Sequence, residues 1–254
     1  MLLPRTPSFR LDGRRALVTG AGRGIGLAIA CALAEAGAEV TLCARSADEL
    51  DAAVEALRLR GDDAQALPLD VTDETAICAA LAARPAFDIL VNNAGMNRPA
   101  AFVDVDMADY DRIMGLNVRA AFAVSQQVAR GMIAAGKPGA IVNVSSQMGH
   151  VGGVDRTVYA ASKHAIEGLT KAMAIELGPK GIRVNSIGPT FIRTELTAST
   201  FANPERLAWI KSKIKLDRIG EVEDIMGAVV FLASDAAALI TGASLLIDGG
   251  WTAG

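Results

Sequence analysis

The chain has 254 residues, with 25 Lys and Arg against 28 Asp and Glu, which gives a formal net charge of −3. This balance excludes the strongly basic surface expected of a nucleic-acid-binding protein and the polybasic segment of a membrane anchor. Hydrophobic residues make up 51% of the chain and charged residues 21%, so the composition favours a large packed core over disorder. No apolar run reaches the roughly 18 residues that a membrane-spanning helix needs, and residues 1–10 lack the apolar segment of a signal peptide.

Cysteine and histidine are scarce. The three cysteines, Cys31, Cys43 and Cys78, form no CxxC pair, and His150 and His164 are the only histidines. We therefore expect neither a disulfide framework nor a metal site, and a reducing cytoplasm is the simplest setting for the protein.

Short apolar runs alternate with amphipathic segments along the whole chain. The apolar runs predict strands at 15–19, 39–43, 64–69, 87–91, 140–144, 182–187 and 244–248. The segments between them predict helices at 24–36, 46–60, 73–83, 107–135, 157–178 and 221–233, with Gly115 and Gly131 as candidate breaks in the fourth. Residues 188–205 show no period and are predicted to form a mobile loop.

This alternation predicts an α/β fold, because successive parallel strands must be joined by crossover connections that are usually helical. Right-handed crossovers produce a doubly wound parallel sheet, here of about seven strands, with helices on both faces. No linker, repeat or low-complexity tract interrupts the pattern, so residues 1–254 are predicted to form a single domain.

A glycine-rich segment, residues 19–26 (TGAGRGIG), lies between the first predicted strand and the first predicted helix. Glycines let the backbone turn tightly and approach a pyrophosphate, while the helix N-terminus supplies N–H groups. The spacing of Gly20, Gly24 and Gly26 departs from the common GxGxxG, but its position after a strand and before a helix favours dinucleotide binding. A glycine-rich turn without a ligand is the alternative.

The end of the second predicted strand bears on the choice of dinucleotide. A carboxylate there binds the ribose hydroxyls of NAD, whereas an arginine accepts the 2′-phosphate of NADP. Here the strand ends in Arg45 with no carboxylate, and Arg23 lies in the glycine-rich segment. NADP(H) is therefore preferred, with NAD(H) as the alternative if Arg45 only faces solvent.

Tyr159 and Lys163 lie four residues apart at the start of a predicted helix, and so share one of its faces. A nearby ammonium favours the phenolate, so Lys163 is expected to lower the pKa of Tyr159 and make it a proton donor and acceptor at neutral pH. Alone, this pattern is more typical of an ordinary surface pair. Ser145 and Ser146, however, end the preceding strand at the sheet edge where ligands bind.

Several segments together resemble the classical short-chain dehydrogenase/reductase family, from Leu11 to about Trp251, and this resemblance implies a Rossmann-like fold. The matching segments are TGAGRGIG (19–26), Asp70-Val71, NNAG (92–95), Asn117, IVNVSS (141–146), YAASK (159–163) and TGASLLIDGG (241–250). The resemblance implies that Tyr159 is the general acid/base and that Ser146, 13 residues earlier, polarises the substrate oxygen. It also implies that Lys163 holds the nicotinamide ribose and that Asn117 positions a water.

The resemblance also implies which residues contact the cofactor. They are Gly20, Arg23, Gly24, Ile25, Gly26, Arg45, Asp70, Val71, Asn92, Ala94, Gly95, Tyr159, Lys163, Pro189, Ile192 and Thr194. One departure from the family pattern is Pro189-Thr190, where Pro-Gly is common.

The resemblance places a substrate lid at about residues 190–215, and implies substrate contacts from Ser146, Met148, His150, Val154 and Tyr159. Arg98 and Arg156 are candidates for binding a carboxylate or phosphate, although ordinary solvated side chains are the simpler interpretation. The expected substrate is a small secondary alcohol or ketone, and the mixture of Gln, His and Arg favours a polyol or sugar acid.

Two alternatives remain, a 3-oxoacyl-thioester reductase and, from another class, a non-catalytic NAD(P)-sensing protein. By resemblance, the last strand and the Ala-rich helices predict a homotetramer.

Overall fold

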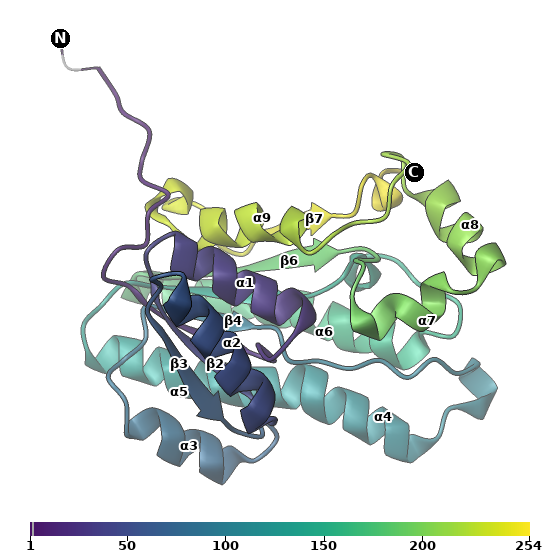
Figure 1. The fold of residues 1–254 in the computed structure, drawn as a ribbon, viewed down its shortest axis with the longest axis horizontal. Helices are drawn as coiled ribbons and strands as arrows, with labels where there is room; N and C mark the ends of the chain where they lie inside the picture. Colours follow the sequence, from purple (N-terminus) through teal and green to yellow (C-terminus); the bar gives the residue numbers. More distant parts are fainter. Residues whose placement is uncertain (2) are drawn as a thin grey trace.

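The computed structural model describes residues 1 and 3–254, except for the side chain of Leu196. Its central feature is a seven-stranded sheet in the order β3-β2-β1-β4-β5-β6-β7 (Figure 1). All neighbouring strands are parallel. The strands are β1 (Arg15–Thr19), β2 (Glu39–Ala44), β3 (Ala64–Pro68), β4 (Ile89–Asn92), β5 (Gly139–Val144), β6 (Ile182–Pro189) and β7 (Ser244–Ile247). The predicted doubly wound α/β fold is confirmed.

Helices cover both faces of the sheet, as the crossover argument requires. They are α1 (Gly24–Glu35), α2 (Ala47–Leu59), α3 (Glu74–Ala82), α4 (Met107–Met114), α5 (Ala121–Ala134), α6 (Thr157–Leu177), α7 (Ala198–Phe201), α8 (Pro204–Lys213) and α9 (Glu223–Ala233). The core side chains of α1, α2 and α9 join one hydrophobic cluster, and those of α3, α5 and α6 join a second cluster on the opposite face.

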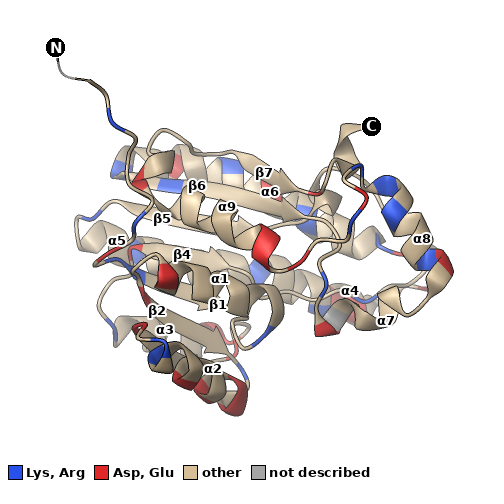
Figure 2. Ribbon diagram, turned by 45° about the horizontal axis from the view of Figure 1, so that its top comes forward, with Lys and Arg blue, Asp and Glu red and all other residues tan. Residues whose placement is uncertain are grey.

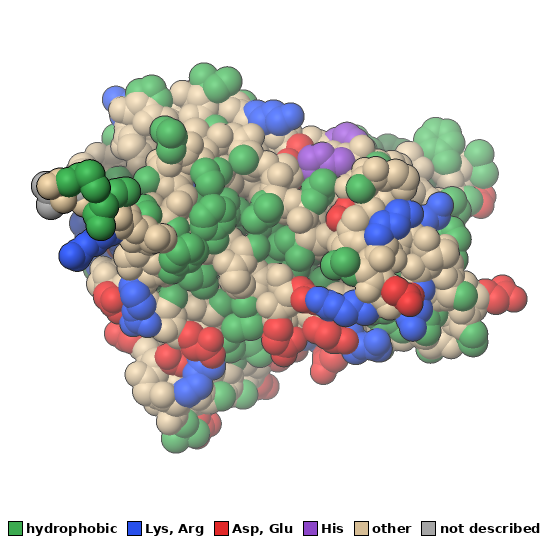
Figure 3. Space-filling view, turned by 90° about the horizontal axis from the view of Figure 1, so that it is seen from above, with side chains coloured by type: hydrophobic (Ala, Val, Ile, Leu, Met, Phe, Trp, Pro, Cys, Tyr) green, Lys and Arg blue, Asp and Glu red, His purple; other side chains and the backbone are tan. Residues whose placement is uncertain are grey.

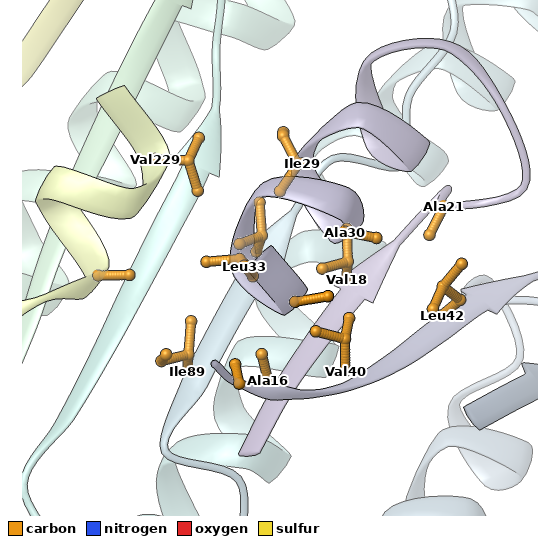
Figure 4. Packing of buried hydrophobic residues seen from close by; sticks show 14 of the residues in the cluster. Ala16, Val18, Ala21, Ile29, Ala30, Leu33, Val40, Leu42, Ile89 and Val229 are labelled. Atoms are coloured by element: carbon orange, nitrogen blue, oxygen red, sulfur yellow. The ribbon is translucent and has the colours of Figure 1, made fainter. Parts of the chain in front are cut away.

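Strand β1 shows how the sheet is buried on both sides. Ala16 and Val18 belong to the first cluster and Leu17 to the second, and all three are at most 2% exposed. Ile29 and Leu33 of α1 pack over the first face (Figure 4). Such burial explains why the strands read as continuous apolar runs in the sequence.

The segment after β6 differs from the sequence prediction. Residues 188–205 were expected to form a loop, but β6 continues to Pro189 and helices α7 and α8 begin at Ala198 and Pro204. Asn203 caps α8 by accepting a hydrogen bond of 3.0 Å from the N–H of Arg206. The loop prediction was wrong there because these helices are short and bury few apolar residues, which leaves little periodicity to detect.

The long helical segment near residue 115 also differs in detail. The chain passes from α4 through a π-helical turn, Gly115–Ala120, into α5 without a break. Gly131 lies inside α5 and does not interrupt it. A π-helical turn is rare and is often found at functional sites, and this one contains Asn117.

Across residues 1 and 3–254, no helix is both long enough and apolar enough to cross a membrane.

Candidate active site

The sheet order reverses between β1 and β4, and the loops after these two strands meet there. Thr19 Oγ1 accepts hydrogen bonds from the backbone N–H groups of Asn93 and Ala94, at 3.0 and 3.1 Å. In return, the Asn93 amide donates to the carbonyl oxygens of Thr19 and Gly20, at 2.9 and 3.0 Å. The predicted glycine-rich and NNAG segments therefore form one rigid edge of the crevice in which doubly wound folds bind ligands.

The glycine-rich segment has no room for side chains at two positions. A Cβ on Gly26 would lie 2.1 Å from the Gly20 carbonyl oxygen, and one on Gly20, which has φ +64°, would lie 2.9 Å from the Ala94 Cα. The first turn of α1 contains no acidic residue, and no side chain caps it at Arg23. By contrast, Ser46 caps α2 and Asp73 caps α3. This cradle fits a dinucleotide phosphate, because the N–H groups at the start of α1 are left for a ligand.

Arg23 and Arg45, the two arginines predicted to bind the 2′-phosphate, have different surroundings. Arg23 Nη1 lies 3.4 Å from a carboxylate oxygen of Glu49 and 3.8 Å from one of Glu195, so its charge is partly compensated. Arg45, exposed just after β2, forms no ion pair with any residue that the structure describes. The contact between Glu49 and Arg23 was not predicted from the sequence. Arg45 is thus the more available cation.

Asp70 and Val71 lie just beyond the end of β3. Asp70 Oδ1 accepts hydrogen bonds from the N–H and the hydroxyl of Thr72, at 2.9 and 2.8 Å. These bonds lower the pKa of Asp70, and Arg45 adds to the effect through its charge. Val71 is buried. The loop is therefore ordered by Asp70 in a conformation that brings it near Arg45.

The structure brings Tyr159, Lys163 and Ser146 together where β5 ends and α6 begins. Lys163 Nζ lies 5.5 Å from the centre of the Tyr159 ring and donates a hydrogen bond of 2.8 Å to the carbonyl oxygen of Val144. Ser146 lies near enough to the Tyr159 phenol to lower its pKa. The Ser146 hydroxyl also donates to Gln147 Oε1 at 2.8 Å, a contact that sequence reasoning did not find. Phenol, ammonium and hydroxyl thus share one buried site.

Burial sets the protonation states of this group. It raises the pKa of Tyr159 above its ordinary value, against the opposing effects of the Ser146 hydroxyl and the Arg156 charge. It also lowers the pKa of Lys163 to about 8, while Glu167 acts in the opposite direction. Tyr159 is therefore a phenol at neutral pH in the protein alone, ready to donate a proton. The expected lowering of its pKa by Lys163 stays a prediction.

Asn117 is held beside this group by the π-helical turn. Its amide donates hydrogen bonds of 3.0 Å to the Met96 carbonyl oxygen and to Ser162 Oγ, and its oxygen accepts one of 2.8 Å from the Met96 N–H. Ser162 in turn donates to the Tyr159 carbonyl oxygen at 2.7 Å. Asn117 therefore joins the loop after β4 to the start of α6.

The end of β6 and the segment after it approach the cradle. Pro189 is buried at the end of β6, Ile192 pairs with Gly220, and the Thr194 side chain lies 3.6 Å from the Cβ position of Gly24. Thr190, at the departure from the family pattern, donates its N–H to the Ile247 carbonyl oxygen at 3.2 Å. Its buried hydroxyl has no hydrogen-bond partner among the residues that the structure describes.

Three predicted site residues are placed differently from the others. The Asn92 amide donates into the interior, to Ser125 Oγ at 2.7 Å and Asn143 Oδ1 at 2.9 Å, which leaves its backbone for a cofactor contact. His150 lies on Ser244 of β7, at 3.0 Å, rather than beside Tyr159. Val154 is 77% exposed. We therefore do not include His150 and Val154 among the proposed substrate contacts.

Met148, in contrast, is buried beside the site, and its N–H donates to Ser146 Oγ at 3.1 Å. Within the described part of the chain, no group of three or more His, Cys, Asp or Glu residues is arranged to hold a metal ion.

Comparison with known proteins identifies the family. A family model described as enoyl-(acyl carrier protein) reductase matches residues 20–252. D-erythrulose reductase of Gallus gallus is 43% identical over 96% of this chain and 98% of its own length. Gluconate 5-dehydrogenase of Gluconobacter oxydans (strain 621H) is 41% identical over 96% of each chain.

A solved gluconate 5-dehydrogenase of Burkholderia cenocepacia J2315, in complex with NADP and tartrate, is 38% identical and has a TM-score of 0.94 over 97% of this chain and 98% of that one. The chain belongs to the short-chain dehydrogenase/reductase family. It is an oxidoreductase that acts on CH–OH groups and their carbonyl counterparts with a nicotinamide dinucleotide, as the sequence resemblance implied.

Proposed function

We propose that this protein interconverts a secondary alcohol and a ketone in a sugar, polyol or sugar acid, with NADP(H) as the preferred cofactor. The observation that carries the proposal is the convergence of the Tyr159, Ser146 and Lys163 side chains beside the dinucleotide cradle. The names of the relatives, which include a ketose reductase and a sugar-acid dehydrogenase, support the substrate class. Residues 1–254 act in this proposal as a single domain, with residues 190–215 as the substrate lid.

Each residue of the site has a role that follows from its contacts. The bound nicotinamide supplies or accepts the hydride. Tyr159 donates the proton to the substrate oxygen in reduction and takes it back in oxidation. Ser146 orients that oxygen by a hydrogen bond. In this proposal Lys163 holds the ribose and favours the phenolate, and Asn117 supports a water-mediated proton path; the hydrogen bonds of Lys163 to the Val144 carbonyl and of Asn117 to Ser162 support these roles.

Two other functions are weaker. A 3-oxoacyl-thioester reductase would use the same chemistry, but the relatives reported above are named for sugar substrates. A non-catalytic sensor would need the cradle but not Tyr159, Ser146, Lys163 and Asn117 together.

A substrate panel tests the proposal. Ketoses, polyols, sugar acids and a 3-oxoacyl thioester are each assayed with NADPH or NADP⁺ and with NADH or NAD⁺, at the nicotinamide absorbance band. We expect turnover of at least one carbohydrate and faster turnover with the phosphorylated cofactor. Turnover of the thioester alone would contradict the proposed substrate class and indicate a 3-oxoacyl-thioester reductase. Absence of turnover with every compound in the panel would favour a non-catalytic sensor.

Arg45 is expected to determine the preference for NADP(H). Replacing it with alanine removes one charge-assisted hydrogen bond to the 2′-phosphate, a loss of roughly 1.5–3 kcal/mol. The Kd for NADPH is then expected to rise about 10- to 100-fold, while that for NADH, which lacks the phosphate, stays unchanged. Fluorescence titration of both cofactors measures this difference. Equal weakening of both would contradict the assignment and indicate damage to the adenosine site as a whole.

The free edge of β7 supports a homotetramer. Strand β7 is the last in the sheet order, Leu245 on it is 37% exposed, and Leu239 nearby is 99% exposed. Figure 3 shows the side of the molecule that lies at the top of Figure 1, and hydrophobic side chains gather on this side. Light scattering after size exclusion is expected to give about four times the chain mass of 26.3 kDa. The mass of a single chain would contradict the proposal.

The remaining proposals concern partners and compartment. In the view of Figure 2, Lys and Arg residues are interspersed with Asp and Glu residues along the ribbon, which supports a small-molecule substrate rather than nucleic acid or a membrane as the partner. All three cysteines are free thiols, which suits a cytoplasmic protein.

A further inference from the structure

Arg156 is a buried cation without an ion pair. It is the N-cap residue of α6, three positions before Tyr159, and is only 7% exposed. Its Nη1 donates a hydrogen bond of 3.1 Å to the backbone carbonyl of Asp155, and no carboxylate of the described residues forms a salt bridge with it. Buried guanidinium groups are normally paired with an anion, because an uncompensated buried charge is costly. The arrangement therefore calls for a ligand.

The backbone next to Arg156 has an unusual conformation and packs closely against its side chain. Asp155 has φ +57°, a left-handed conformation that is unusual for a residue other than glycine and often accompanies functional sites. Its carbonyl oxygen also accepts a 3.3 Å hydrogen bond from the Ala100 N–H. Gly153 has no space for a Cβ, which would lie 2.9 Å from Met148 Cε and 3.4 Å from Arg156 Cβ. The Arg156 stem is therefore packed in place.

A second cation comes from the lid. Arg206 on α8 is half-buried and forms no salt bridge with the residues that the structure describes. It lies close enough to Arg156 to help burial lower the pKa of that guanidinium, and Asp155 only partly offsets this through space. Arg206 thus adds positive charge near Arg156, and the Arg156 charge opposes the rise that burial causes in the pKa of Tyr159. The mutual repulsion of the two arginines would be relieved by an anion bound between them.

The start of α6 adds to this positive region. No side chain caps its N-terminus, and its first turn contains no acidic residue. The 21-residue helix therefore presents its partial positive charge at the same end as Arg156 and Tyr159. Arg98, the other arginine predicted to meet an anion, is different, because it lies 3.4 Å from Asp109 and is already paired.

We propose that Arg156 and Arg206 form a subsite for the carboxylate of the substrate, and that this chain acts on sugar acids in preference to neutral ketoses and polyols. The proposal rests on the function proposed above and selects one of its substrate classes. An arginine fork matches the two oxygens of a carboxylate. Arg206 belongs to α8, within the segment proposed as the lid, so a carboxylate bound there would lie under the lid while Tyr159 faces the reacting oxygen.

Binding of two matched ligands tests the proposal without turnover. D-gluconate and D-sorbitol share a six-carbon polyhydroxy chain and differ by the carboxylate. Each is titrated calorimetrically into protein saturated with NADPH, a complex in which an alcohol cannot be oxidised. Gluconate is expected to bind at least about tenfold tighter than sorbitol, in line with one or two charge-assisted hydrogen bonds.

Variants locate the effect. Arg156→Gln is expected to weaken gluconate binding about 10- to 100-fold and to leave sorbitol binding unchanged, whereas Arg156→Lys retains part of the preference. Arg206→Gln is expected to have the same selectivity with a smaller effect, because that side chain is less buried. Arg98→Gln is the control, and neither ligand should respond to it.

Two results would overturn the inference: equal affinity of the unaltered protein for both ligands, or equal weakening of both by Arg156→Gln. The latter would mean that Arg156 acts through Tyr159 or the fold. The substrate panel separates this failure from failure of the proposed function. Turnover of neutral sugars without an acid preference would leave the function intact, whereas selective gluconate binding without turnover of any carbohydrate would refute the function alone.

Discussion

Replacing Tyr159 with phenylalanine is expected to lower kcat/KM by about 10²- to 10⁴-fold, the range that a positioned general acid/base contributes. The neighbouring polar groups are hydrogen-bonded elsewhere, and the Lys163 ammonium donates to the Val144 carbonyl oxygen at 2.8 Å. The Ser146 hydroxyl proton is directed to Gln147 at 2.8 Å. His150 lies on Ser244 at 3.0 Å, and the His164 ring lies 2.9 Å from the Ala160 carbonyl oxygen. The rate is measured with NADPH and the best substrate of the panel.

The cofactor and the second tyrosine supply the controls. The cradle at residues 19–26 does not include the phenol, so the Kd for NADPH of Tyr159→Phe is expected to stay within a few-fold. Tyr110, the only other tyrosine, is 37% exposed on α4, and Tyr110→Phe should keep full activity. If Tyr159→Phe retained a tenth or more of the activity while Tyr110→Phe was normal, the acid/base assignment would be wrong.

The sheet could be predicted because its strands are buried on both faces. Continuous apolar runs such as 15–19 and 140–144 bounded by polar or glycine residues can be recognised without tertiary information. Helices α7 and α8 could not be recognised in the same way. Their stability comes from tertiary contacts, such as those of Ile210 with Phe191 and Trp251 in a small separate cluster, and from a local cap at Asn203 whose signal is easily missed in a polar segment.

The features of the site also divide into those that could be predicted from the sequence and those that could not. The pairing of Tyr159 with Lys163 follows from helical spacing, and the meeting of the 19–26 and 92–95 segments follows from sheet topology. The pairing of Arg23 with Glu49, the burial of Arg156 and the position of His150 on β7 depend on contacts between distant segments. Sequence spacing carries no information on such contacts, so an arginine that is expected to be solvated can prove to be buried beside the site.

Gly26→Ala is expected to remove cofactor binding and to destabilise the fold. The added Cβ would lie 2.1 Å from the Gly20 carbonyl oxygen and 2.4 Å from the Asn93 amide nitrogen, and the first of these is backbone that cannot rotate away. Overpacking of this kind costs about 3 kcal/mol, which lowers the Tm of a chain of this size by roughly 6–12 °C. The cradle must also shift, so NADPH should no longer raise the Tm.

A second helical glycine provides the matched control. A Cβ on Gly131, inside α5, would lie 3.6 Å from Ala86 Cβ and 3.9 Å from Ala86 Cα, which are ordinary van der Waals contacts. Gly131→Ala should therefore gain about 1 kcal/mol of helix propensity, which raises the Tm by roughly 2–4 °C, and NADPH should still stabilise the variant. Because the expected changes in Tm have opposite signs at Gly26 and Gly131, the two variants distinguish a steric clash in the cradle from a general effect of replacing a helical glycine with alanine. If NADPH stabilised Gly26→Ala as much as the unaltered protein, the cofactor phosphates would have to lie elsewhere.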